Sequence, residues 1–142
     1  MLLSYFRVIF RIPALGGPKR PKCPCAAEHI ERRIRDLALS FPEAYEDRPW
    51  GDFPVYKVGE NRVFAWAVRD GEGVRVTLKL TAEEREIAGL LPFVGRARYV
   101  GRYGWITADV TDDESLDAAL EWLRESYWLK APVHLRHAVE GE

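Results

Sequence analysis

The sequence predicts a single α+β domain whose antiparallel sheet carries helices on one face and leaves the other face open. Two observations predict this fold: apolar runs of strand length are separated by short glycine-containing turns, and the flanking segments have apolar residues at helical spacing. The chain has 142 residues, 47% of them hydrophobic, which is enough for one core of its own. We expect the domain at residues 26–132, between a basic extension and linker at 1–25 and a C-terminal tail at 133–142.

The domain is expected to begin with an amphipathic helix over residues 26–39. Ile30, Ile34 and Leu37 recur at spacings of four and three, which places them on one face of a helix. A Phe-Pro pair follows at 41–42. Because the residue before a proline avoids the helical region, the helix is expected to end before this pair.

Three strands are expected next, at residues 55–58, 63–68 and 74–80. In the last of these, apolar and polar residues alternate at every position, which is typical of a strand with one buried face. The turns between the runs are short and contain glycine, which favours an antiparallel meander. A later strand is expected at 105–110.

Two further helices are expected to begin at capping boxes, in which a hydroxyl and a carboxylate each bond a free backbone N–H. Thr81-Ala-Glu-Glu84 opens a short helix that ends at residues 91–92. Thr111-Asp-Asp-Glu114 opens a longer helix that continues to residue 127. The tail shows no periodicity and is expected to be irregular.

The charge distribution restricts the partners of the domain. Residues 1–25 carry five basic side chains and no acidic one, whereas residues 26–131 carry 15 basic and 20 acidic side chains, a net charge of −5. Phosphate neutralisation dominates nucleic-acid affinity, so a nucleic-acid binder usually has a basic balance. Any basic patch on this domain must therefore be local.

Nothing in the sequence predicts export or membrane insertion. The two cysteines, Cys23 and Cys25, are too close together to predict an internal disulfide. No run approaches the roughly 20 apolar residues of a membrane span, and Arg7 and Arg11 interrupt the apolar N-terminus. We expect a cytoplasmic protein without a membrane partner, either a monomer or a weak dimer.

The sequence lacks a catalytic constellation, and we expect a binding module and not an enzyme. There is no Gly-x-Ser-x-Gly motif, and the three histidines fall on a helix surface and in the tail. Cys23-x-Cys25 and His134-x-x-His137 would supply four zinc ligands if they met, but neither spacing is usual. The acidic segment 112–125 offers only loosely arranged carboxylates for a divalent ion. We therefore expect no metal and no cofactor.

Basic and aromatic residues are interleaved along the predicted sheet, as a nucleic-acid surface requires, because guanidinium groups bind phosphate and rings stack on bases. The candidate nucleic-acid-binding residues are Lys57, Arg62, Arg75, Lys79, Arg96, Arg98 and Arg102. The candidate stacking residues are Trp50, Trp66, Tyr103 and Trp105. In the alternative interpretation, the rings of the strands belong to the core and the arginines pair with the surplus of acids.

The segment Pro49-Trp50-Gly51 has two interpretations. Proline fixes the entry of a turn, glycine permits a positive φ, and the indole provides a large area to bury. Trp50 either plugs a long loop onto the sheet or stacks on a ligand, and the sequence favours the structural role.

A series of short motifs runs through residues 26–129 in a specific order and spacing. They are Ser40-Phe-Pro-Glu43, Pro49-Trp50-Gly51, Tyr56-Lys57-Val58, Leu78-Lys79, Gly101-Arg-Tyr-Gly-Trp105 and Ser126-Tyr127. This series resembles the MmcQ/YjbR-like family. The resemblance implies a fold similar to that of the bacterial frataxin homologue, and DNA binding through hairpins that act as wings. Many members carry a histidine shortly before the Gly-Trp segment, where this sequence has Arg98-Tyr99-Val100, so a role of that histidine does not transfer.

By this resemblance the wing tips would be residues 59–62 and 70–73. Asp70 and Glu72 are unfavourable groups to place near phosphate, so the second tip argues against a wing. We expect a domain that binds DNA or another nucleic acid through a local basic-aromatic patch. The alternative is a small-ligand or protein-interaction module with an apolar pocket formed by Trp50, Trp66 and Trp105.

Overall fold

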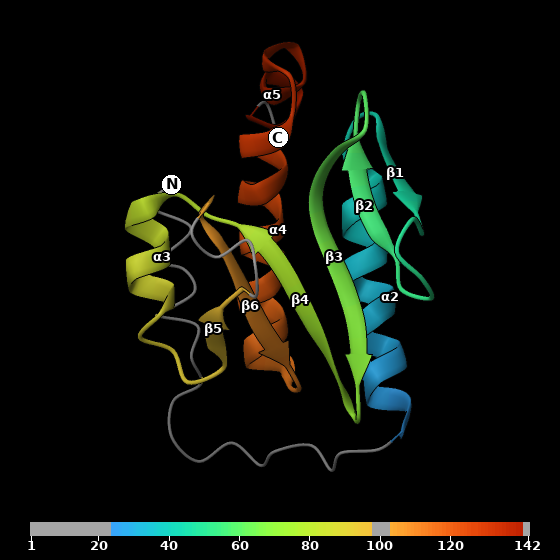
Figure 1. Cartoon of the computed structure of the whole chain (residues 1–142), viewed down its shortest axis with the longest axis vertical. Helices are drawn as coiled ribbons and strands as arrows, with labels where there is room; N and C mark the ends of the chain where they lie inside the picture. The colour runs from blue at the N-terminus through green and yellow to red at the C-terminus, as the bar shows by residue number, and fades with distance from the viewer. Residues whose placement is uncertain (1–23, 98–102, 141–142) are drawn as a thin grey trace.

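The computed structural model describes residues 24–97 and 103–140, so residues 1–23 of the predicted extension lie outside the description. The elements are, in order, α2 (Pro24–Ser40), β1 (Ala44–Asp47), β2 (Val55–Val58), β3 (Arg62–Asp70), β4 (Gly73–Lys79), α3 (Ala82–Ala88), β5 (Val94–Arg96), β6 (Trp105–Val110), α4 (Asp113–Lys130) and α5 (Val133–Glu140). The strands have the order β1-β2-β3-β4-β6-β5, and every neighbouring pair is antiparallel (Figure 1). The predicted α+β class is confirmed, and the more specific likeness to the frataxin homologue stays a prediction.

Helices α2 and α4 pack on the same face of the sheet (Figure 1). α2 begins at Pro24, whose fixed φ suits the first turn of a helix. It buries Ile30, Ile34 and Ala38 against the sheet. The amphipathic helix predicted over residues 26–39 is therefore confirmed, with its apolar stripe in the core.

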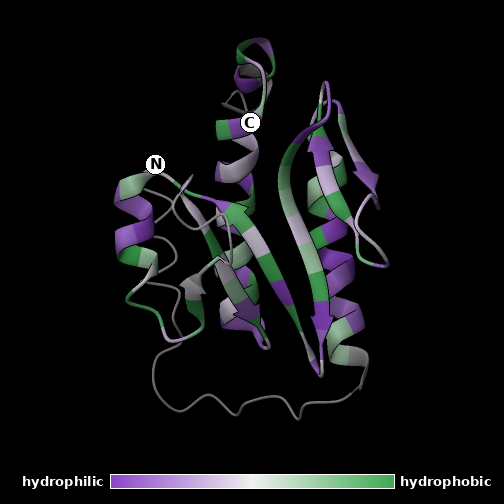
Figure 2. Cartoon of the chain, viewed as in Figure 1, coloured by the Kyte–Doolittle hydropathy of each residue, from purple (hydrophilic) through white to green (hydrophobic). Residues whose placement is uncertain are grey.

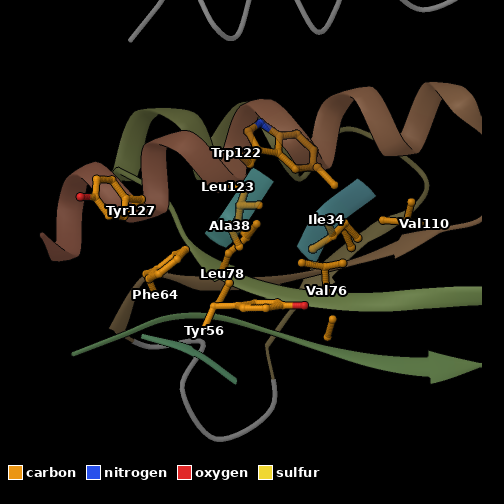
Figure 3. Close-up of a cluster of buried hydrophobic side chains, with 14 of the residues drawn as sticks. Ile34, Ala38, Tyr56, Phe64, Val76, Leu78, Val110, Trp122, Leu123 and Tyr127 are labelled. Carbon is orange, nitrogen blue, oxygen red and sulfur yellow. The ribbon is translucent and has the colours of Figure 1, made fainter. Parts of the chain in front are cut away.

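The core lies between these two helices and the sheet (Figure 3). Fully buried side chains come from α2, α4, β2, β3 and β4, and the largest of them include Trp122, Tyr127, Tyr56, Phe64 and Ile34. Each aromatic ring removes roughly 150–250 Å² from water, so these residues dominate the packing. Hydrophobic and hydrophilic residues alternate along the strands, as expected for a sheet with one face in the core, and the end of the β3–β4 hairpin is hydrophilic (Figure 2).

A β-bulge turns Phe64 into this core. Tyr56 and Lys57 of β2 pair with Ala65 and Val63 of β3, so Phe64 has no partner on β2. The extra residue interrupts the alternation of the strand, and Phe64 and Ala65 are both fully buried. The bulge therefore decides which residues of β3 reach the other face of the sheet.

Three elements differ from the sequence-based expectation. β1 and β5 have four and three residues without an apolar run, and both lie at edges of the sheet. The tail is not irregular after Pro132: it forms α5, whose Leu135 is buried against the core. A helix of only eight residues is too short to show a clear periodicity in the sequence. None of the described helices is long and apolar enough to cross a membrane.

Both predicted capping boxes mark helix starts, but their partners differ from the prediction. α4 begins one residue later than predicted, with Asp112 accepting from the backbone N–H of Ser115 and the Ser115 hydroxyl accepting from the backbone N–H of Asp112. At α3, the Thr81 hydroxyl accepts from the backbone N–H of Glu84 at 3.3 Å. The Glu84 carboxyl makes no return bond, so only half of this box forms.

The carboxyl of Glu84 is buried instead. Glu84 is 2% exposed, and neither of its oxygens has a hydrogen-bond partner among the described residues. Burial disfavours the charged form and raises the pKa of Glu84 to about 7, and the negative charges of Glu121 and Glu83 act in the same direction. This carboxyl is therefore mostly protonated below about pH 7.

We expect Glu84→Gln to remove a pH-dependent loss of stability. Because the pKa of Glu84 is raised from 4.5 to about 7 in the folded chain, its stabilising contribution is complete below pH 4.5 and is lost as the pH rises through about 7. Between about pH 5 and about pH 8.5, the parent should lose about 1–3 kcal/mol of unfolding free energy relative to the variant. Urea unfolding at several pH values measures this difference. Glu86→Gln, at an exposed position of the same helix, is the control, and identical pH profiles for parent and Glu84→Gln would contradict a protonated carboxyl.

Candidate functional site

The sheet face opposite the helices can be assigned from the strand register. Residues directly opposite each other in antiparallel strands project to the same face. Trp66 pairs with Thr77, and Thr77 pairs with Thr107. Lys79 pairs with Trp105. Because the residues that alternate with these five lie in the core, the five project from the other side of the sheet, which we call the open face.

Three tryptophans contact one another on the open face, and we call Trp50, Trp66 and Trp105 the aromatic row. Trp66 stacks on Trp105 with ring centroids 5.2 Å apart, and Trp50 meets Trp66 edge-on at 5.4 Å. Trp105 is 9% exposed, whereas Trp50 is 57% exposed. Tyr103, two residues before Trp105, is also exposed. The row therefore lies outside the helix-side core and ends in an exposed indole.

The loop that carries Trp50 is held by Arg48. The Arg48 guanidinium donates to the backbone oxygen of Asp52 at 2.6 Å and to the Glu46 carboxylate at 3.3 Å. Glu46 in turn pairs with Arg35 of α2 at 3.2 Å. These bonds connect the loop to the helix layer, so Trp50 is anchored on the sheet while more than half of its surface stays exposed.

Lys57, a predicted phosphate contact, is buried in an ion pair. Its side chain is 7% exposed and donates to Asp47 at 2.7 Å and to the side chain of Asn61. The hydrogen bond from Lys57 is the main cause that lowers the pKa of Asp47. A buried ammonium requires such partners. Lys57 therefore joins β1, β2 and the following turn, and a phosphate could reach it only by breaking this pair.

Arg75 lies on the open face but is also neutralised. It pairs with Asp70 at 2.8 Å and with Asp109 at 3.0 Å, so its charge is balanced from two neighbouring strands. Asp70 belongs to the second predicted wing tip, residues 70–73. This tip uses its carboxylate to hold an arginine of the sheet.

The remaining predicted cations differ in position. Lys79 lies half-buried on the open face, opposite Trp105. Arg62 donates from the helix side to the backbone oxygen of Lys130 at 3.3 Å. The positions that fall outside the described side chains are Arg96, Arg98 and Arg102.

Two further cations, Arg85 and Lys130, lie near Lys79 and carry no signal in the sequence that would mark them as site residues. Arg85 lies on α3, and its guanidinium approaches the same glycine, Gly104, as the Lys79 side chain. Lys130 ends α4, and the positive charge of Lys79 contributes to the lowering of its pKa. In the sequence both residues look like ordinary surface cations of helices, and only the tertiary fold places them beside Lys79.

The zinc alternative gains no geometric support. His134 lies 3.7 Å from Glu43, while Cys23 and the side chains of Cys25 and His137 fall outside the described part of the chain. Over the residues that the structure does describe, no three His, Cys, Asp or Glu side chains come together as metal ligands. This includes the acidic segment of α4.

Comparison with known proteins shows the family of this chain. The YjbR family model matches residues 39–129, more than half of the sequence. The chain belongs to the YjbR family. The resemblance found in the sequence motifs is thereby confirmed, whereas no curated protein matches the sequence.

Two solved structures are similar to this YjbR chain. A Deinococcus radiodurans protein with a DUF419 domain is 23% identical, with a TM-score of 0.63 over 84% of this chain and 91% of that chain. A Pseudomonas syringae protein is 17% identical, with a TM-score of 0.58 over 70% of this chain and 97% of that chain. At these identities the likeness shows a shared fold.

In this YjbR domain, one buried hydroxyl ties the open face to the helices. Pairing between β3 and β4 extends to Ala65 and Leu78, beyond which the strands separate (Figure 1). The next bond of the ladder would join the backbone N–H of Lys79 to the carbonyl of Phe64. The hydroxyl of Ser126 lies between them, accepting from Lys79 at 2.9 Å and donating to Phe64 at 2.5 Å. Ser126 therefore holds the backbones of β3 and β4 together at the point where the two strands stop pairing.

Ser126→Ala is expected to lower the free energy of unfolding by about 1–3 kcal/mol, because a buried carbonyl and a buried N–H lose their shared partner. Urea denaturation measures the loss. The control is Ser40→Ala, which removes an exposed hydroxyl bonded to the carbonyl of Leu37 and should cost less than about 0.5 kcal/mol. Equal losses in the two variants would show that the inserted hydroxyl has no special role.

Proposed function

We propose that the open face binds single-stranded nucleic acid by stacking its bases on the aromatic row. The observation that most directly supports this is Trp50, which is 57% exposed at the end of three contacting indoles. Rigid aromatic rings exposed on a sheet are the platform on which unpaired bases stack. The proposed activity is binding alone, without a catalytic step.

Single strands fit this face better than a duplex does. The bases of a duplex are already stacked on one another, so a duplex presents mainly phosphate to a flat surface. On the described part of the open face, Lys57 and Arg75 are paired with carboxylates and Lys79 is not. Stacking contributes about 1–3 kcal/mol per base and depends less on salt than phosphate contacts do. We therefore expect a shallow salt dependence, with a log–log slope of about −0.7 for each phosphate contact.

Trp50→Ala is expected to weaken the binding of a fluorescent single-stranded oligonucleotide by roughly 5- to 100-fold, which corresponds to the loss of one stacked base. Fluorescence anisotropy measures the affinity. The matched control is Leu90→Ala, which truncates another exposed apolar side chain, in the turn after α3. A duplex of the same sequence should bind more weakly than the strand. The proposal fails if Trp50→Ala binds like the parent, or if the parent binds neither oligonucleotide at micromolar concentration.

The paired charges of the open face favour a second candidate, a small planar ligand or a protein segment on the aromatic row. Because Lys57 and Arg75 are neutralised, most of this face has little attraction for a polyanion. A ligand of this kind should quench tryptophan fluorescence equally at low and high salt and should raise the melting temperature. Single-stranded DNA should fail to displace it, whereas displacement would support the nucleic-acid proposal.

A further inference from the structure

Four cations gather at the end of the sheet where β3 and β4 separate. Lys79 ends β4, Arg62 begins β3, Arg85 lies on α3 and Lys130 ends α4. We call these four residues the cationic cluster. They come from four different elements, so the fold and not the sequence spacing brings them together.

Lys79 and Arg85 meet at Gly104. A Cβ atom placed on Gly104 would lie 3.6 Å from Lys79 Cε and 3.7 Å from Arg85 Cζ, so both side chains approach the same backbone position. Gly104 has a φ of +97°, and its carbonyl accepts from the backbone N–H of Leu80 at 3.0 Å, which holds this junction in place. The Nε of Arg85 is buried and has no hydrogen-bond partner among the described residues.

Lys130 and Arg62 extend the cluster on the helix side of the sheet, where α4 ends and β3 begins. Burial lowers the pKa of Lys130, and the positive charges of Lys79 and Arg62 lower it further. Both of the charges that lower this pKa are therefore positive. Arg62 is oriented by its hydrogen bond from Nη1 to the Lys130 carbonyl oxygen at 3.3 Å.

The cluster differs from the cations of the domain that ion pairs neutralise. Carboxylates hold five such cations, namely Arg35, Arg48, Lys57, Arg69 and Arg75. Within residues 24–97 and 103–140, neither Lys79, Arg85 nor Lys130 has a carboxylate partner. The C-terminus of α4 is a favourable place for Lys130 and Arg62, since cations stabilise that end of a helix. It does not account for Lys79 and Arg85, whose charges lie together without a paired acid among the described residues, although residues 26–131 carry a net charge of −5.

We propose that the cationic cluster binds a phosphate group. This inference rests on the proposed nucleic-acid function and extends it. The phosphate group would belong to the backbone of the same strand whose bases stack on the aromatic row. Lys79 connects the two sites, because it pairs with Trp105 across the sheet and belongs to the cluster. Guanidinium and ammonium groups are the donors that phosphate oxygens require. Free phosphate has the same chemistry, so the experiment must separate the two sources.

Inorganic phosphate tests the cluster without any nucleic acid. In the full chain, phosphate should raise the melting temperature in a saturable manner at constant ionic strength, whereas chloride should not. Lys79→Gln and Arg85→Gln should each weaken the apparent phosphate affinity by about tenfold or more, the usual effect of losing a charged hydrogen bond. Arg32→Gln, which removes an exposed charge from α2, is the matched control and should bind phosphate like the parent. No phosphate effect in the parent, or an unchanged effect in Lys79→Gln, would overturn the proposal.

A single-stranded oligonucleotide distinguishes the cluster from the aromatic row. Lys130→Gln should reduce the magnitude of the log–log salt slope by about 0.7, whereas Trp50→Ala should weaken binding at every salt concentration and leave the slope unchanged. If phosphate binds and no strand does, the cluster is supported as a site for free phosphate and the nucleic-acid function fails. If a strand binds but Lys79→Gln and Lys130→Gln leave its slope unchanged, the cluster proposal is overturned and the nucleic-acid function stands.

Discussion

The connection between the helix layer and the open face of the sheet depends on the hydroxyl of Ser126. It takes the place of a ladder bond between β3 and β4, and it thereby joins a helix behind the sheet to the strand end that carries Lys79 on the open face. The neighbouring bulge turns Phe64 towards the helices, and two residues later Trp66 lies on the opposite side. Core packing and the composition of the open face are therefore set within the same short stretch of β3.

Much of the fold follows from local signals in the sequence, and the remainder is decided by contacts between distant segments. α2, the meander and β6 are predicted because each has an apolar run of strand length or apolar residues at helical spacing. β1 and β5 have no such apolar run, and they are strands because β2 and β6 offer them edges to pair with. At the start of α4, Thr111 and Asp112 are both suitable caps, and the reciprocal bond with Ser115 selects the aspartate.

The candidate site is predictable in its residue types but not in its geometry. The side to which Trp66 projects depends on the bulge, which no local pattern marks. Lys57 looks like a free cation in the sequence, yet it is neutralised because β1 brings Asp47 to it. The cationic cluster is invisible in the sequence for the same reason, since Arg85 and Lys130 become neighbours of Lys79 only after the helices have packed.

Ion pairing makes the distribution of free charge uneven along the open face. Exposed pairs such as those of Arg75 contribute only about 0–1 kcal/mol each, so their main effect is to remove charge from one end of the sheet and not to stabilise it. What remains is an apolar row that begins at the exposed Trp50 and ends at Trp105, opposite Lys79. A ligand with planar and anionic parts can satisfy the indoles and the cations together only when its anionic part lies at the Trp105 end. The arrangement of charge along the row, more than its area, would therefore set the direction in which a strand binds.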